Sequence, residues 1–194
     1  KNLCKYKMTG LRKANAYSKR IVVPYTRISK RKNRSYIKVV PPQKIVKFSM
    51  GEGKVYEAGK FPHRLALSTT EAVQIRHNAL ESCRQYLNKV LDETLVGQYF
   101  LRVVPFPHHI QRENKMLTGA GADRMQTGMQ LSFGKCIGKS AILKPNAEIF
   151  FIAVATPKAV VLAREAFKAI KAKLPCKTRV LYEYTPQIAL QIAQ

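Results

Sequence analysis

Residues 148–184 read EIFFIAVATPKAVVLAREAFKAIKAKLPCKTRVLYEY. The run Glu148–Val154 is almost entirely apolar, which is typical of a strand buried on both faces of a sheet. Thr156-Pro157 then supplies a capping hydroxyl and a proline at the first helical position. The buried stripe expected on this helix is Val160, Ala163, Phe167 and Ile170. The rest of the helix surface is expected to be basic. The cations expected to spread around it are Arg164, Lys168, Lys171 and Lys173. With Thr178–Tyr184 as a closing strand, the stretch predicts a strand–helix–strand unit.

A second unit of the same kind is predicted upstream. Ser68 and Glu71 have the spacing of a capping box, and apolar residues repeat near the helical period from there to Leu91. Arg64–Leu67 before this helix and Gln98–Val104 after it have the composition of strands. Further strands are expected at Tyr36–Val40, Lys44–Phe48 and Ser140–Leu143.

This order of elements predicts an α+β fold, in which two strand–helix–strand units form an α/β sandwich with both helices on one sheet face. We assign the folded domain to residues 36–184, with residues 111–139 inserted in it as a long loop. Residues 1–35 show no apolar period and are predicted to be a basic extended arm. Residues 185–194 are expected to form a C-terminal tail.

The charge of the chain limits the classes of protein to which it can belong. The 194 residues include 35 Lys and Arg against 11 Asp and Glu, a formal net charge of +24. A compact chain with this charge needs a polyanionic partner, and nucleic acid is the usual one. An independent small-molecule enzyme is therefore disfavoured. Disorder throughout the chain is excluded because 46% of the residues are apolar.

Positive charge is concentrated near the start of the sequence. Residues 1–60 contain 17 Lys and Arg but only 2 acidic residues, and single tyrosines, Tyr17 among them, lie between the cations. Such a pattern can neutralise phosphates and stack on bases, although a solvated tail has the same charge runs. The total charge favours RNA contact. The expected contact residues of the arm are Arg27, Lys30, Arg31, Lys32 and Arg34.

Neither a metal site nor a membrane span is indicated. The four cysteines lie at least 40 residues apart, and none has another Cys or a His at the spacing of zinc ligands. We therefore expect no metal and no cofactor. The longest apolar run, Ile149–Ala155, is too short to span a bilayer, and the first twenty residues contain no apolar signal core. We expect a cytoplasmic protein whose sequence, which begins at Lys1 without Met, is processed or incomplete.

The central loop contains five of the ten glycines, all between Gly119 and Gly138. A connection of this length in a compact domain is usually functional, and glycine allows close approach to a phosphate backbone. The glycines of this loop do not have the spacing that nucleotide-binding motifs of enzymes require. Gly138-Lys139-Ser140 has Phe133 where a phosphate-binding loop needs its first glycine, and Gly119-Ala-Gly121 is followed by Arg124 where a dinucleotide fingerprint needs its third.

The central motif resembles that of a known family. Residues 114–129, Asn-Lys-Met-Leu-Thr-Gly-Ala-Gly-Ala-Asp-Arg-Met-Gln-Thr-Gly-Met, followed by Phe133-Gly-Lys135, are similar to the signature loop of one large-subunit ribosomal protein family. It is called L-sixteen in bacteria and L-ten-e in archaea and eukaryotes. The resemblance extends over residues 20–180, and the archaeal form is the more similar. Supporting stretches are Pro24–Arg27, Ser35–Gly51, Glu71–Arg84, Leu162–Lys168 and Lys173–Thr178.

The resemblance implies a non-enzymatic structural constituent of the large ribosomal subunit. It would bind large-subunit ribosomal RNA near the aminoacyl-tRNA site and the peptidyl-transferase centre and help to position tRNA. Its implied partners are that RNA, tRNA and neighbouring ribosomal proteins, with no membrane. Phosphate contacts are expected from Arg112, Lys115, Arg124, Lys135 and Lys139. Close backbone approach is expected at Gly119, Gly121 and Gly128, and sugar or base contacts at Gln126 and Thr127.

The sequence departs from the family pattern in three places. The start is longer and richer in lysine than is usual in the family, both at residues 1–23 and at Lys30–Arg34. Cys136 stands where the family commonly has proline. Residues 186–194 have no counterpart in the family pattern. Two other functions remain open from the residues alone. One is a free-standing RNA-binding regulator with the same fold. The other is an enzyme that uses His108, His109 or Cys136.

Overall fold

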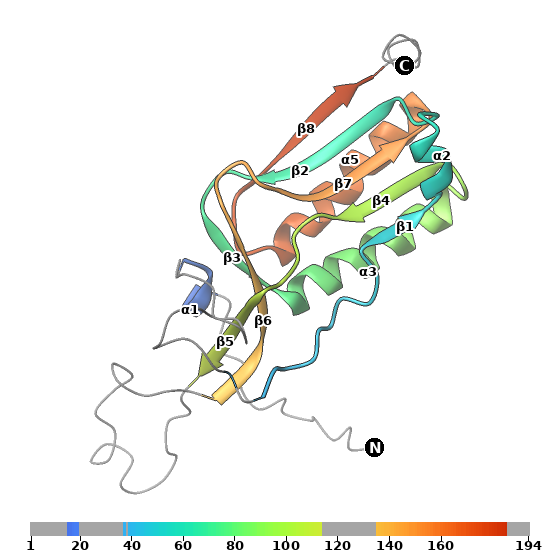
Figure 1. Ribbon diagram of the computed structural model, residues 1–194. Helices are drawn as coiled ribbons and strands as arrows, with labels where there is room; N and C mark the ends of the chain where they lie inside the picture. The colour runs from blue at the N-terminus through green and yellow to red at the C-terminus, as the bar shows by residue number, and fades with distance from the viewer. Residues whose placement is uncertain (1–14, 20–36, 38, 114–134, 186–194) are drawn as a thin grey trace, which may run out of the picture.

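The computed structural model describes residues 15–19, 37, 39–113 and 135–185. Strand β7 lies at the centre of a five-stranded sheet with the order β1-β4-β7-β2-β8, and every pair in it is antiparallel (Figure 1). As the continuous apolar run predicts, β7 is buried on both faces. The strands are β1 (Ser49–Gly51), β2 (His63–Thr69), β4 (Tyr99–Val103), β7 (Glu148–Val154) and β8 (Thr178–Tyr184).

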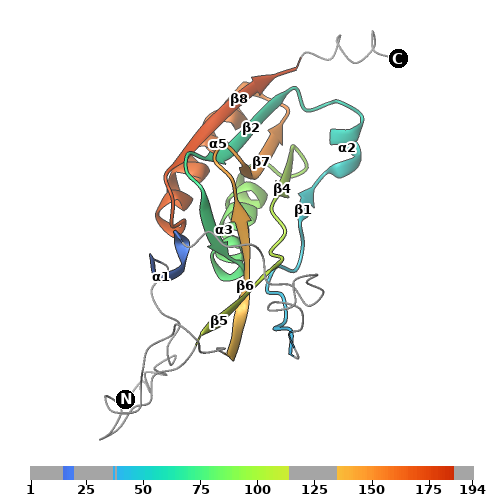
Figure 2. The same ribbon diagram turned by 60° about the vertical axis from the view of Figure 1, so that its left-hand side comes forward.

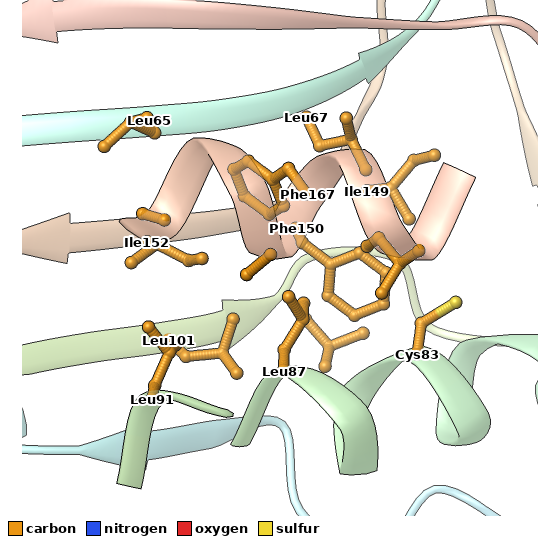
Figure 3. Packing of buried hydrophobic residues seen from close by; sticks show 14 of the residues in the cluster. Leu65, Leu67, Cys83, Leu87, Leu91, Leu101, Ile149, Phe150, Ile152 and Phe167 are labelled. Atoms are coloured by element: carbon orange, nitrogen blue, oxygen red, sulfur yellow. The ribbon is translucent and has the colours of Figure 1, made fainter. Parts of the chain in front are cut away.

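The two long helices, α3 (His77–Thr94) and α5 (Pro157–Ile170), cover the same face of this sheet. Their apolar sides and the sheet enclose the main core, where Phe150 of β7 and Phe167 of α5 are fully buried (Figure 3). Thr156 caps α5 as predicted, since its hydroxyl oxygen accepts a hydrogen bond from the Ala159 N–H at 3.3 Å. The predicted α+β fold is therefore confirmed, with a short 3-10 turn, Lys171–Lys173, after α5.

The opposite face of the sheet carries a smaller apolar cluster beneath the short helix α2 (Gly53–Glu57). The rings of Tyr56 and Phe100 stack there, with centroids 4.7 Å apart, beside Phe151 of β7. Burial on this face explains why β7 has no polar side, because its alternate residues enter one cluster or the other.

A second sheet of three antiparallel strands, in the order β3-β6-β5, extends from the body. Its strands are β3 (Val73–Arg76), β5 (His109–Glu113) and β6 (Lys135–Leu143). The strand predicted at Ser140–Leu143 thus begins earlier, at Lys135. The flanks of the predicted loop 111–139 are paired strand and not loop, so this boundary was wrong.

The first long helix begins later than the sequence predicts. Ser68, the expected capping residue, lies in β2, and α3 starts at His77 without a side-chain cap. The Glu71 carboxylate accepts a hydrogen bond from the Lys177 backbone N–H at 3.2 Å instead of capping a helix. Strand β3 occupies the expected first turns because its pairing with β6 buries two apolar side chains. The capping-box prediction was wrong, and tertiary pairing outweighs the local signal.

The strands predicted at Tyr36–Val40 and Lys44–Phe48 were also wrong. Ile37 and residues 39–47 have no strand structure, and only the three residues of β1 pair with β4. Pro41-Pro42 removes two successive backbone donors from this segment, which disfavours a ladder. Ile45 is nevertheless buried in the main core, so the segment packs as irregular chain.

In the described parts of the chain, none of the helices is long and apolar enough to cross a membrane.

Candidate nucleic-acid interface

Strands β5 and β6 form a hairpin that extends beyond the five-stranded sheet (Figure 2). Glu113, the last residue of β5, pairs with Lys135, the first residue of β6. Both ends of the glycine-rich segment 114–134 are therefore held at the same end of the hairpin. The register shifts between Gln111 and Arg112, an irregularity of the kind that bends and twists a hairpin.

Three predicted contact residues are described, and all lie on this hairpin. Lys135 is exposed, whereas Arg112 and Lys139 are half-buried. Arg112 lies opposite Cys136 and Lys139 lies opposite Ile110, so strand alternation puts the two cations on one face of the hairpin. The other predicted residues lie outside the described part of the chain: Lys115, Gly119, Gly121, Arg124, Gln126, Thr127, Gly128, Arg27, Lys30, Arg31, Lys32 and Arg34.

A neutral histidine lies among cations at the base of the hairpin. His77, the first residue of α3, is 5% exposed and packs against Gly138, where an added Cβ would lie 3.2 Å from His77 Nε2. Burial, together with the positive charges of Lys44, Lys139 and Arg76, lowers the pKa of His77 from 6.5 to about 4. His77 is therefore uncharged near neutral pH, and Lys44, Lys139 and Arg76 form a cluster that we call the hairpin-base cations.

The N-terminal arm contacts the small sheet through the short helix α1 (Asn15–Ser18). The Tyr17 hydroxyl donates a hydrogen bond of 2.8 Å to Glu113 Oε2, and Arg76 Cζ lies 4.4 Å from the centroid of the Tyr17 ring. The sequence offered Tyr17 as a residue able to stack on RNA bases. In the fold, contacts within the protein occupy both its ring and its hydroxyl.

Comparison with known proteins places these features in a family. The sequence profile described as "Ribosomal protein L16p/L10e" matches residues 24–181. The chain belongs to this ribosomal protein family. It is 42% identical to the large ribosomal subunit protein uL16 of Staphylothermus marinus, over 89% of this chain and 94% of that protein. Identity to the uL16 of Sulfolobus acidocaldarius is 41%, over 88% and 92% of the two chains. For the uL16 of Thermofilum pendens it is 43%, over 82% and 89%.

As an L16p/L10e protein, the chain is a structural, non-enzymatic constituent of the large ribosomal subunit and is cytoplasmic with that subunit. The predicted archaeal-like resemblance is confirmed. Membership favours a ribosomal role over the free-standing regulator. The enzyme alternative was wrong.

The residues named for that enzyme have ordinary structural settings in this L16p/L10e protein. His109 is buried in β5, whereas His108 is exposed, with its ring 4.6 Å from that of Phe106. Burial raises the pKa of the Cys136 thiol, which favours the protonated form. Burial also raises the pKa of the Cys83 thiol, to about 12, which favours its protonated form. Among the described residues, no three His, Cys, Asp or Glu side chains form a group able to hold a metal ion.

Two of the hairpin-base cations, with His77, are the part of this interface that sequence reasoning missed. Arg76 pairs with Ser140 across β3 and β6, although the two residues are far apart in the chain. The predicted helix had placed Arg76 in a helical turn, which hid that pairing. Lys44 was assigned to a strand that does not form. The false capping signal at Ser68 therefore also concealed part of the site.

Proposed function

We propose that the β5–β6 hairpin binds large-subunit ribosomal RNA near the aminoacyl-tRNA site and the peptidyl-transferase centre, and that it helps to position tRNA. The observation that carries the proposal is the placement of Arg112, Lys135 and Lys139 on the paired strands that flank segment 114–134. A paired hairpin fixes where this segment leaves and re-enters the domain, as positioning requires.

Electrostatics supports RNA as the ligand. Arg112 and Lys139 share one hairpin face, and Lys139 belongs to the hairpin-base cations with Lys44 and Arg76. Cations gathered in this way displace the counterions condensed on phosphates, which gives binding that weakens steeply with salt. Folded RNA is recognised largely by shape and backbone contacts, so no base-reading helix is needed. In this proposal the protein positions RNA and tRNA, and RNA performs the peptide-bond chemistry.

The predicted contacts outside the described residues remain part of the proposal. In the glycine-rich segment, Lys115 and Arg124 would bind phosphates, while its glycines admit the RNA backbone. The basic run Lys30–Arg34, with Arg27, would anchor the arm by bulk charge. Neighbouring ribosomal proteins are the remaining proposed partners.

The proposal is tested by shortening the segment that the hairpin presents. Deletion of residues 116–128 should leave thermal unfolding of the domain unchanged, because the deletion spares every described strand. Translation by large subunits that carry the variant should fall, since the contact to the tRNA site is lost. The control is Lys54→Ala/Lys60→Ala, which removes two exposed cations from the region of α2 and should leave translation unchanged. Normal translation with the deletion variant would contradict the proposal.

A further inference from the structure

Helix α5 and strand β8 lie on the body of the protein, apart from the β5–β6 hairpin (Figure 1). A second group of cations lies on α5 and on the turn that follows it. Arg164, Lys168 and Lys171 line a groove of about 450 Å³ together with Val180 of β8. The prediction that the cations of this helix are spread around its surface was wrong for these three residues. Their spacing of four and then three residues puts them in one row, about 10 Å long from the first to the last. We call this feature the α5–β8 groove.

No ion pair within the described chain neutralises the cations of the groove, and Glu165, which follows Arg164 on α5, is in none of the ion pairs either. Arg164, Lys168 and Lys171 are all exposed, and none of the ion pairs found between described residues includes them. The carboxylates of the nearby strands are engaged elsewhere. Glu148 and Glu183 both bind Arg64, at 2.9 and 2.7 Å.

An exposed aromatic ring lies beside the cations of the groove. Arg164 Cζ lies 5.5 Å from the centroid of the Tyr182 ring, a stacking contact that restrains the plane of the guanidinium. Tyr182 itself is 43% exposed and provides a flat wall beside the cations. Because β8 is an edge strand of the sheet, no other strand among the described residues closes this side.

We propose that the α5–β8 groove is a second RNA site, which binds a sugar–phosphate backbone independently of the hairpin. A row of three cations suits an extended polyanion better than a single small anion, and an arginine fork can bind a phosphate through two hydrogen bonds. The cores of protein–protein interfaces are depleted of charged residues, whereas three of the four residues that line this groove are cations. Backbone phosphates of RNA are therefore favoured over a protein partner. The inference rests on the proposed function only in taking ribosomal RNA as the polyanion.

The test compares two triple variants of the full chain that lose the same charge. The groove variant is Arg164→Ala/Lys168→Ala/Lys171→Ala, and the control is Lys54→Ala/Lys60→Ala/Lys144→Ala, whose residues are exposed outside the groove. Binding to a 20-base-pair RNA duplex is measured between 50 and 200 mM salt. The slope of log affinity against log salt should become shallower by about 2 to 3 in the groove variant and by less than about 1 in the control. Affinity at 100 mM salt should fall at least tenfold more in the groove variant.

Equal losses in the two variants would overturn the inference. It would also be overturned if the groove variant bound the RNA duplex normally but lost binding to polyglutamate, since the site would then be one for acidic protein. Thermal unfolding of both variants checks the fold. If the groove variant is destabilised, Lys168→Gln/Lys171→Gln is compared with Lys54→Gln/Lys60→Gln, and an equal loss of affinity counts against the groove.

Failure of this inference is distinguishable from failure of the proposed function. The deletion of residues 116–128 tests the hairpin through translation, whereas the groove variant is tested through backbone binding to a duplex. If the groove variant binds the duplex normally and the deletion variant impairs translation, the results support the hairpin alone. The reverse pattern, a groove variant with weakened duplex binding and a deletion variant with normal translation, supports the groove alone.

Discussion

At the base of the hairpin, the protonation of one side chain depends on the charges around it. His77 is buried against Gly138 and lies near Lys44, Arg76 and Lys139. Protonation would add a fourth positive charge in a poorly hydrated place, so the neutral ring is favoured. The neutral ring supports the strand beneath it without adding to the repulsion among these cations.

This setting predicts a dependence of stability on pH. The pKa of His77 is about 4 in the folded chain and near 6.5 when unfolded, so the unfolded state binds more protons between these values. The His77 contribution is fully present above pH 6.5 and is lost as the pH falls towards 4. The free energy of unfolding, measured with urea, should decrease by about 2 kcal/mol between pH 7 and pH 5 from this residue.

Two variants isolate the contribution of His77. His77→Gln should remove most of the decrease between pH 7 and pH 5, because glutamine does not titrate. His108→Gln should leave it, since His108 is exposed. The hydrogen bond that Arg84 donates lowers the pKa of Glu81. The contribution of the Glu81 carboxylate to the free energy of unfolding is therefore lost at lower pH than the range from 7 to 5. An unchanged pH dependence in His77→Gln would refute the assignment.

At the scale of elements, the C-terminal strand–helix–strand unit was readable from its sequence, whereas the small sheet and the start of α3 were not. Strand β7, helix α5 and strand β8 follow from an apolar run, a capped helix start and a proline stop, all of them local signals. The start of α3 at His77 depends on the pairing of β3 with β6, whose residues are distant in sequence. For the same reason, the site was predictable at Arg112, Lys135 and Lys139, whereas the contribution of Arg76 required the fold.

The contact between β1 and β4 gives a prediction at this scale. Gly51 has φ +84°, and a Cβ added there would lie 2.3 Å from the carbonyl oxygen of Tyr99. Gly51→Ala must therefore adopt a strained backbone and also push two strands apart, which should cost about 3 kcal/mol or more. The control, Gly97→Ala, has φ +69° but nothing within 4 Å of the added Cβ, so it should cost only about 1 kcal/mol. Equal costs in chemical denaturation would show that the close approach is unimportant.

At the scale of the whole molecule, the net charge of +24 is divided among separate surfaces. Residues 1–35 contain 12 Lys and Arg and no acidic residue, which suits an arm that anchors through bulk charge. The hairpin and the α5–β8 groove contain fewer cations, but the fold sets them in defined rows. A chain with several basic surfaces on one compact body is suited to contact RNA on more than one side.

The most direct test of the central claim is a cryo-EM map of the large ribosomal subunit from the source organism. The account predicts that the β5–β6 hairpin lies against ribosomal RNA beside the peptidyl-transferase centre, with Arg112 and Lys139 within about 3 Å of phosphate oxygens. A map in which the hairpin points to solvent, or in which the chain lies far from the aminoacyl-tRNA site, would contradict it.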